Sequence, residues 1–126
     1  MPKESSNFMI YDQNNVFAKI IRGELPSTKV YEDEKILAFD DLYKDAPIHV
    51  LVIPKGEYLN FSDFVSKAKP EEVSYFFKKI AEIAKLLGVD ESGFRLISNI
   101  GADASQAIPH FHVHILAGKK MQQHLA

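Results

Sequence analysis

Residues 109–116 read Pro-His-Phe-His-Val-His-Ile-Leu, and three of the chain's five histidines alternate there with apolar residues. An alternation of period two is typical of a β-strand with one apolar and one polar face. We therefore expect the three imidazoles to project from one side of a sheet, while Phe111, Val113 and Ile115 point into a core on the other side. Folding alone does not require histidine at three such positions, so the pattern indicates a functional site.

The segments around this strand predict an α+β fold with an antiparallel sheet. The apolar run Ile48–Ile53, which ends at Pro54, is typical of a central strand covered on both faces. Pro70 opens the clearest helix, whose apolar stripe ends before Gly88. Strands and helices do not alternate regularly, which argues against βαβ units. The two predicted helices are Val16–Arg22 and Pro70–Leu87, and the five predicted strands are Lys29–Glu32, Ile36–Asp40, Ile48–Ile53, Phe94–Asn99 and the histidine strand at 109–116.

Length and composition limit the class of protein. The 126 residues predict one domain spanning 1–126, in which the polar residues 1–14 form a loose arm. A formal charge of -2 gives no basic surface for nucleic acid or for an anionic membrane. Zero cysteines exclude disulfides and thiolate metal sites and fit a reducing compartment. No apolar run resembles a signal segment or a membrane span, so we expect a cytoplasmic protein with no nucleic-acid or membrane partner.

The alternating histidines allow three interpretations: a metal site, a nucleophilic or acid–base site, and a structural coincidence. Alternate strand residues lie roughly 6.7 Å apart, so the α-carbons of the outer two histidines are about 13 Å apart. A histidine with its zinc bond reaches about 6 to 7 Å, so these two could share an ion only when stretched in line, which a tetrahedral site forbids. At most two of the three could be ligands, with His49 available as another. We expect no metal and no other cofactor, and a metal site stays as the minority alternative.

A nucleophilic site uses the same spacing better, because His112 lies between two other imidazoles. Free imidazole has a pKa near 6.5, so roughly three-quarters of it is neutral at pH 7 and able to attack. Crowded imidazoles favour a neutral nucleophile beside a protonated donor. One histidine can then bond to phosphorus while another donates a proton to the leaving group. The loop of small residues at 100–108 could direct backbone N–H groups at phosphate oxygens, so the residues indicate a histidine-based site for an anionic substrate.

Residues 110–116 match the His-φ-His-φ-His-φ-φ motif, and the chain resembles the histidine triad (HIT) superfamily of nucleotide hydrolases and transferases. The resemblance is greatest to the Hint-type nucleoside phosphoramidase branch. It extends over residues 16–118, followed by a tail at 119–126 that is expected to shape the choice of leaving group. The other segments that carry it are the opening helix at Phe17–Pro26, the central strands at Phe39–Asp41 and Ala46–Lys55, and the phosphate loop at Asn99–Gly101 with Gln106.

The resemblance implies an α+β, HIT-like domain with a five-stranded antiparallel sheet and two helices. It also implies a homodimer with a continuous ten-stranded sheet. The implied enzyme is a hydrolase or transferase that cleaves a purine nucleoside monophosphate from a phosphoramidate, ester or anhydride through a nucleotidyl-histidine on His112. The alternatives are a nucleotide-binding regulatory module with little turnover and a dinucleoside polyphosphate hydrolase.

The resemblance further implies roles for individual residues. His112 falls on the family's nucleophile, and His114 falls on the residue that binds the phosphate and the leaving group. His110 and His49 fall on the supporting histidines. Asp41 matches the carboxylate that holds the ribose hydroxyls, since one carboxylate can accept from both. The other implied substrate-binding residues are Asn99 and Gln106 at the phosphate and Phe17, Ile20 and Phe39 at the base.

One position departs from the phosphoramidase branch. That branch commonly carries a serine three residues before the first triad histidine, where it donates to the phosphate and the leaving group. This chain has Ala107, which cannot donate, so we expect weaker phosphoramidase activity or a different leaving group. Ser105 lies close enough in sequence to take over the donor role.

Overall fold

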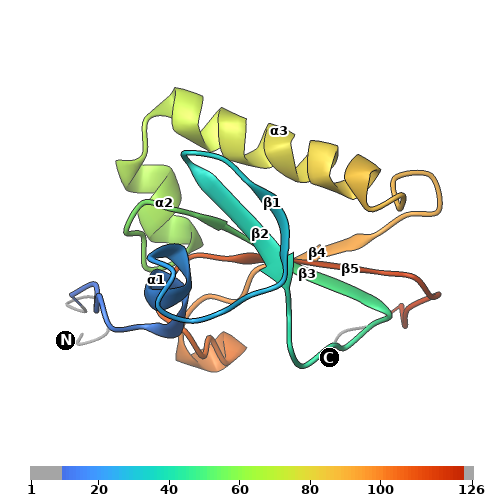
Figure 1. Ribbon diagram of the computed structural model, residues 1–126, viewed down its shortest axis with the longest axis horizontal. Coiled ribbons are helices and arrows are strands. Elements are labelled where there is room, and N and C mark those ends of the chain that lie inside the picture. Colours follow the sequence, from blue (N-terminus) through green and yellow to red (C-terminus); the bar gives the residue numbers. More distant parts are fainter. Residues whose placement is uncertain (1–9, 124–126) are drawn as a thin grey trace.

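A single antiparallel sheet of five strands forms the centre of the molecule, in the order β1–β2–β3–β5–β4 (Figure 1). The computed structural model describes residues 10–123. The strands are β1 Lys29–Glu32, β2 Ile36–Asp40, β3 Ile48–Pro54, β4 Arg95–Ile97 and β5 Val113–Ala117. The predicted α+β class and the five-stranded antiparallel sheet are confirmed.

The described residues contain three α-helices, so the expectation of only two was wrong. The helices are α1 Val16–Ile21, α2 Phe61–Lys67 and α3 Pro70–Leu86, and a short 3-10 helix, η2, spans Ala102–Ala104. The unpredicted helix is α2, which has seven residues. Asn60 caps it by accepting a hydrogen bond from the Asp63 N–H at 2.9 Å, and Phe64 buries its side chain in the core. A helix this short depends on its cap and on tertiary burial.

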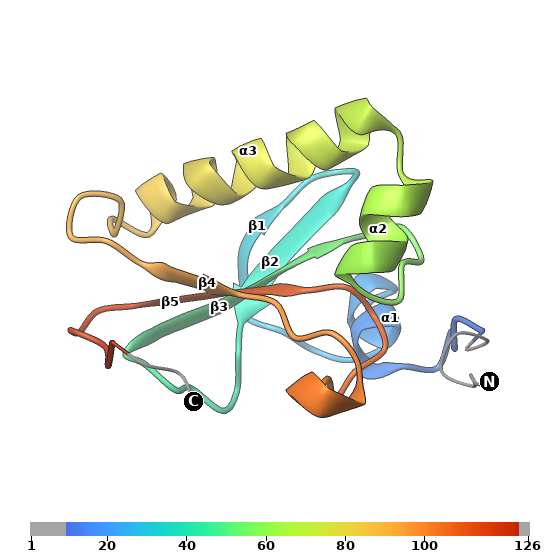
Figure 2. The same ribbon diagram turned by 180° about the vertical axis from the view of Figure 1, so that it is seen from behind.

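Alternation along the strands produces a different apolar cluster on each face of the sheet. α2 and α3 cover one face, where Phe64 and Phe76 pack with Val52 (Figures 1 and 2). α1 covers part of the opposite face, where Phe17 packs with Leu51. The side chains of successive β3 residues therefore pack on opposite faces of the sheet, as expected for a central strand buried on both sides.

The histidines lie on the α1 face. His49 has the same parity on β3 as Leu51, and Leu51 is the register partner of His114 on β5. Val113 and Ile115 are buried on the opposite face with α3, as the alternation predicted. One strand thus separates a purely apolar core from a polar site.

The regular part of the histidine strand begins later than predicted, at Val113 rather than at residue 109. The reason is that the N–H of Phe111 donates to the carbonyl of Tyr58, in the loop after β3, at 2.7 Å. His110 therefore lies in a bend at residues 108–110, and His112 lies in the irregular stretch between this bend and β5.

The ends of α1 follow the sequence signals. Asn15 caps the helix by accepting from the Ala18 N–H at 2.9 Å, and Gly23, at φ 79°, follows its last turn. The predicted arm at 1–14 and the predicted tail at 119–126 lie partly outside the described residues, and His124 lies wholly outside them. Within residues 10–123 no helix combines the length and the apolar composition that crossing a membrane requires.

Candidate active site

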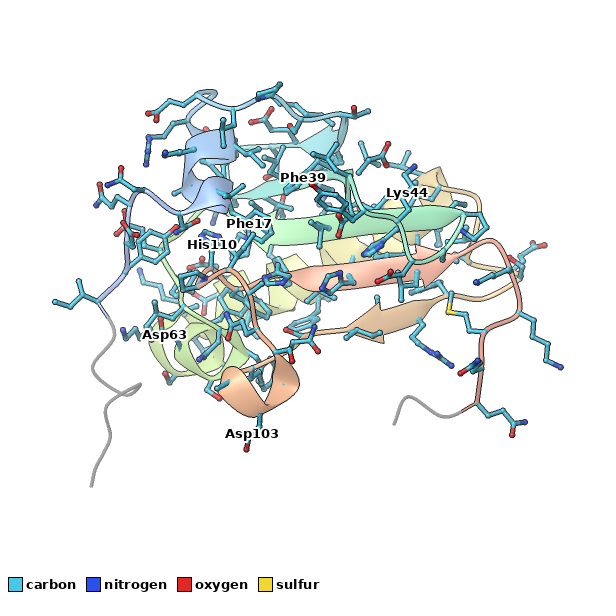
Figure 3. The ribbon with its side chains drawn as sticks, turned by 90° about the horizontal axis from the view of Figure 1, so that it is seen from below. Phe17, Phe39, Lys44, Asp63, Asp103 and His110 are labelled. Atoms are coloured by element: carbon cyan, nitrogen blue, oxygen red, sulfur yellow. The ribbon has the colours of Figure 1, made fainter. Side chains whose placement is uncertain are left out.

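A cavity of about 450 Å³ opens on the α1 face of the sheet. Its walls come from α1, the loop between β2 and β3, β3 itself, and the loop before β5. Figure 3 looks onto this side of the molecule, where Phe17, Phe39 and His110 are labelled. This volume suits a small-molecule ligand. The predicted site residues that line it are His112, His114, His49, Asp41, Asn99, Ser105, Phe17, Ile20 and Phe39.

Two other predicted site residues, Gln106 and His110, are not part of this lining. The Gln106 amide donates to the carbonyls of Leu59 and Ile108 at 2.8 and 3.0 Å, and its oxygen accepts from the Gly101 N–H at 2.9 Å. Gln106 therefore shapes the loop from behind. His110 has no exposed surface.

The hydrogen bonds of His112 assign its tautomer. Its Nδ1 lies 2.7 Å from the carbonyl oxygen of His110. A carbonyl can only accept, so this nitrogen carries the proton. In the neutral ring, Nε2 then has a free lone pair. Because His112 lines the cavity, this unprotonated nitrogen is the candidate nucleophile.

His114 has the opposite tautomer, which His49 imposes on it. The backbone N–H of Asp45 donates to Nδ1 of His49 at 3.1 Å, so neutral His49 carries its proton on Nε2. That Nε2 lies 2.8 Å from Nδ1 of His114 and donates to it. The proton of His114 is therefore on Nε2. His112 and His114, two residues apart in the chain, thus offer one lone pair and one N–H.

Burial keeps the imidazoles of His112 and His114 neutral. It lowers the pKa of His112, although the His110 carbonyl and the Asp41 carboxylate oppose the shift. Burial, followed by the charges of His112 and His49, lowers the pKa of His114 to about 4. The donor is therefore a neutral imidazole at pH 7 rather than the protonated ring that the sequence suggested.

Asp41, His49 and His114 bring three candidate metal-ligand atoms within 4.8 Å of one another. The spacing fits a hydrogen-bond chain better than an ion. Two histidine nitrogens on one tetrahedral zinc lie roughly 3.3 Å apart, given bonds of about 2.0 Å. Here the nitrogens of His49 and His114 are 2.8 Å apart, and Oδ2 of Asp41 is 3.3 Å from Nε2 of His49. These side chains would have to move apart to hold a metal.

The loop before β5 contributes a left-handed turn to the cavity. Ser105 has φ 59° and ψ 41°, a conformation that is uncommon outside glycine. It follows η2 and lines the cavity together with Ala107. In the cavity wall, Ser105 therefore carries a hydroxyl group that can donate a hydrogen bond, whereas the methyl group of Ala107 cannot.

Several residues at the site were not predicted. The hydroxyl of Ser98 donates to the carbonyl of His112 at 2.9 Å, and Tyr11 hydrogen bonds to His110. Leu42 and Tyr43 line the cavity although these residues are 88% and 84% exposed. Only this last pair had a sequence signal, as two large apolar residues directly after Asp41 in a polar loop.

Comparisons with known proteins agree with this arrangement. The HIT domain matches residues 22–121. An uncharacterized HIT-like protein of Rickettsia prowazekii is 52% identical over 112 residues, which are 89% of this chain and 93% of that protein. A histidine triad protein from Clostridium difficile is 44% identical with a TM-score of 0.81, over 92% of this chain and 100% of that one. A HIT family hydrolase from Clostridium thermocellum is 39% identical with a TM-score of 0.80, over 90% and 98%. This chain belongs to the HIT family.

Proposed function

We propose that the protein is a nucleotide hydrolase or transferase that acts through a covalent nucleotidyl-histidine on His112. The observation that carries the proposal is the 2.7 Å hydrogen bond from Nδ1 of His112 to the His110 carbonyl, since it leaves Nε2 unprotonated at the cavity. The name of the Clostridium thermocellum relative, a HIT family hydrolase, supports the same class of reaction.

The reaction would run in two steps. Nε2 of His112 attacks the phosphorus atom and forms a phosphorus–nitrogen bond, while the bond from phosphorus to the leaving group breaks. His114 hydrogen bonds to the phosphate or the leaving group through its Nε2–H and keeps that proton, while the leaving group takes up a proton from solvent as it departs. Water then adds its hydroxyl group to phosphorus and returns one proton to solvent. This step breaks the bond between phosphorus and His112, releases the nucleoside monophosphate and restores the free imidazole.

The charge of the cavity supports a substrate with few phosphates. Within residues 10–123 the cavity lining includes Asp40, Asp41 and Asp45 but no lysine or arginine. Asp40 is paired with Lys44 at 3.9 Å, so two carboxylates, those of Asp41 and Asp45, would repel the several negative charges of a dinucleoside polyphosphate. A nucleoside monophosphate joined to a neutral or cationic amine suits the site better. We therefore favour a purine nucleoside phosphoramidate over the dinucleoside polyphosphates.

The apolar part of the cavity supports a nucleoside at the α1 end. The aromatic rings of Phe17 and Phe39 lie 5.7 Å apart at an interplanar angle of 72°, and Ile20 joins them in the lining. This pocket would receive the base, and Asp41 would accept hydrogen bonds from the ribose hydroxyls.

Mass spectrometry after rapid quenching tests the proposal. The protein is mixed with adenosine 5′-phosphoramidate, and we expect a nucleoside monophosphate adduct on the peptide that contains His112. The His112→Asn variant should give neither adduct nor turnover. Full turnover by that variant, or an adduct on another residue, would exclude the mechanism.

A regulatory module that binds nucleotide with little turnover is the second candidate, because Ala107 lines the cavity without a donor. It would bind adenosine monophosphate in calorimetry and give no product after long incubation with a substrate panel. Ala107→Ser distinguishes the candidates further. A gain in phosphoramidase rate would indicate that turnover depends on this donor.

We also propose that the protein forms a homodimer through β4. Among the described residues 10–123 this strand ends the sheet on one side, so its outer backbone groups are open to pairing. Leu96 on this strand is 46% exposed, and pairing of β4 with a second copy of the chain would cover this apolar side chain. Light scattering should give the mass of a dimer, and Leu96→Lys should shift it toward the monomer. A monomer at all concentrations of the unmodified protein would contradict this assembly.

A further inference from the structure

Tyr11 precedes α1 and lies 99 residues before His110 in the chain, yet its hydroxyl hydrogen bonds to Nδ1 of that histidine. The two rings are 5.5 Å apart at an interplanar angle of 67°. Neither residue belongs to the cavity lining. A contact with substrate therefore does not explain this pair.

The partners of His110 assign its tautomer and the direction of the bond. Its Nε2 lies 2.8 Å from the carbonyl of Pro54, so this nitrogen carries the proton. Nδ1 of the neutral ring then accepts, and the hydroxyl of Tyr11 donates. Burial lowers the pKa of His110 to about 4, so the ring stays neutral at pH 7. Without the hydroxyl, a fully buried acceptor would lose its protein partner.

His110 is in turn connected to the candidate nucleophile. Its carbonyl is the group that accepts from Nδ1 of His112. The ring of Phe17 also contacts both histidines, at 6.2 Å from the centroid of His110 and 5.0 Å from that of His112. A change in the orientation of residue 110 would therefore alter the bond that determines which nitrogen of His112 is free.

Tyr11 is itself held in place. The side-chain amide of Asn15 donates to the carbonyl of Asp12 at 2.8 Å, and Arg22 donates to the carbonyl of Gln13 at 2.7 Å. Burial raises the pKa of Tyr11, so its hydroxyl keeps its proton at neutral pH. The segment before α1 thus presents a fixed donor to the triad.

We propose that Tyr11 is a positioning residue for His112. It holds the ring and tautomer of His110, and through the His110 carbonyl it keeps the proton of His112 on Nδ1. The effect on turnover rests on the proposed function, whereas the effect on the tautomers does not.

The test compares Tyr11→Phe with Tyr75→Phe. Phenylalanine keeps the ring contact and removes only the donor. Tyr75 is a matched control, because its hydroxyl also donates to a single acceptor, Asp33, and it lies on α3, outside the cavity lining. Nitrogen-15 NMR of the histidine rings reports the tautomers, and steady-state kinetics reports kcat and KM separately, at a temperature where both variants are folded.

We expect Tyr11→Phe to shift the nitrogen signals of His110 and to give His112 a mixture of tautomers. We expect kcat to fall about tenfold with KM nearly unchanged, because the nucleophile is affected while the cavity lining is not. Tyr75→Phe should change neither readout. A lower melting temperature for Tyr11→Phe with unchanged tautomers and kcat would overturn the proposal. If no protein turns over substrate, the proposed function fails, and the NMR result alone then decides the role of Tyr11.

Discussion

The two faces of the sheet are built from alternate residues of the same strands, yet they differ in kind. On the α3 face, Phe64, Phe76 and Phe111 form a fully buried aromatic group, with the rings of Phe64 and Phe111 stacked 4.9 Å apart. On the α1 face, a smaller apolar cluster gives way to buried histidines and an open cavity. Apolar packing stabilises the first face. On the second face, each buried histidine forms a hydrogen bond to a specific partner.

Along a single strand, the residues that face α3 therefore contribute to stability, and those that face α1 contribute to the candidate active site. On the α3 side a change of side-chain volume is expected to affect the free energy of unfolding. On the α1 side a change of hydrogen-bonding group is expected to affect the tautomers and the reaction. The predictions below test whether the two faces are independent in this way.

The largest effect is expected for His112→Asn. It removes the proposed nucleophile, so turnover of adenosine 5′-phosphoramidate should fall by a factor on the order of 10⁴ or more. The free energy of unfolding should change little, because the α3 core is untouched. Turnover assays with urea denaturation on the same preparation measure both. Equal losses of stability and activity would show that the two faces are not independent.

The converse change is Phe64→Ala on the α3 face. Truncating this fully buried ring should lower the free energy of unfolding by about 3 to 5 kcal/mol. Where the variant is folded, its affinity for adenosine monophosphate should match that of the unmodified protein. Urea denaturation and calorimetry check the two parts. A weakened affinity at low temperature would indicate that the faces are coupled through the strands.

The third prediction concerns the pH dependence of stability. Burial lowers the pKa of His110 to about 4, while the unfolded chain has a value near 6.5. As the pH falls below 6.5 the unfolded state takes up the proton first, so stability is full above pH 6.5 and decreases between pH 6.5 and 4. His110 alone should account for a loss on the order of 3 kcal/mol in the free energy of unfolding over this pH range. Urea midpoints at pH 7 and pH 4.5 measure the loss, and His110→Gln should reduce it. A flat profile would contradict the assigned neutral state.

The smallest effects are expected at two matched helix caps. Asn15 caps α1 and Asn60 caps α2, each by accepting from a backbone N–H at 2.9 Å. Asn60→Ala should cost about 1 kcal/mol of stability. Asn15→Ala should cost somewhat more, because the amide of Asn15 also donates to the Asp12 carbonyl. Only Asn15→Ala should also weaken binding of adenosine monophosphate, since α1 carries Phe17 and Ile20 into the cavity wall. Equal binding by both variants would show that α1 does not position the base pocket.

The sheet could be predicted because its signals are local. Alternation and turn residues predicted β1 and β2 at their observed bounds, and the apolar run predicted β3. The short helix α2 was missed, although Asn60 precedes apolar residues at Phe61, Phe64 and Val65. Seven residues give too weak a periodic signal, and the burial of Phe64 against α3 stabilises them.

The site could be predicted only as a set of residues. Alternation placed His112 and His114 on one face, and the family resemblance indicated Asp41 and the residues at the base. Gln106 shows the limit, because the family resemblance implied a phosphate contact, whereas its amide donates to the carbonyls of Leu59 and Ile108. Where a side chain points within an irregular loop depends on partners that the local sequence does not specify.

The sequence by itself determined which residues share a face, because side-chain direction in a strand follows from the parity of the position. Tertiary structure alone decided which nitrogen of His110 and of His114 carries a proton. That choice depends on groups from distant segments, namely the Pro54 carbonyl and the Tyr11 hydroxyl for His110 and the ring of His49 for His114. The hydrogen-bond partner of a histidine selects one of its two neutral tautomers, so this selection occurs only once the chain has folded.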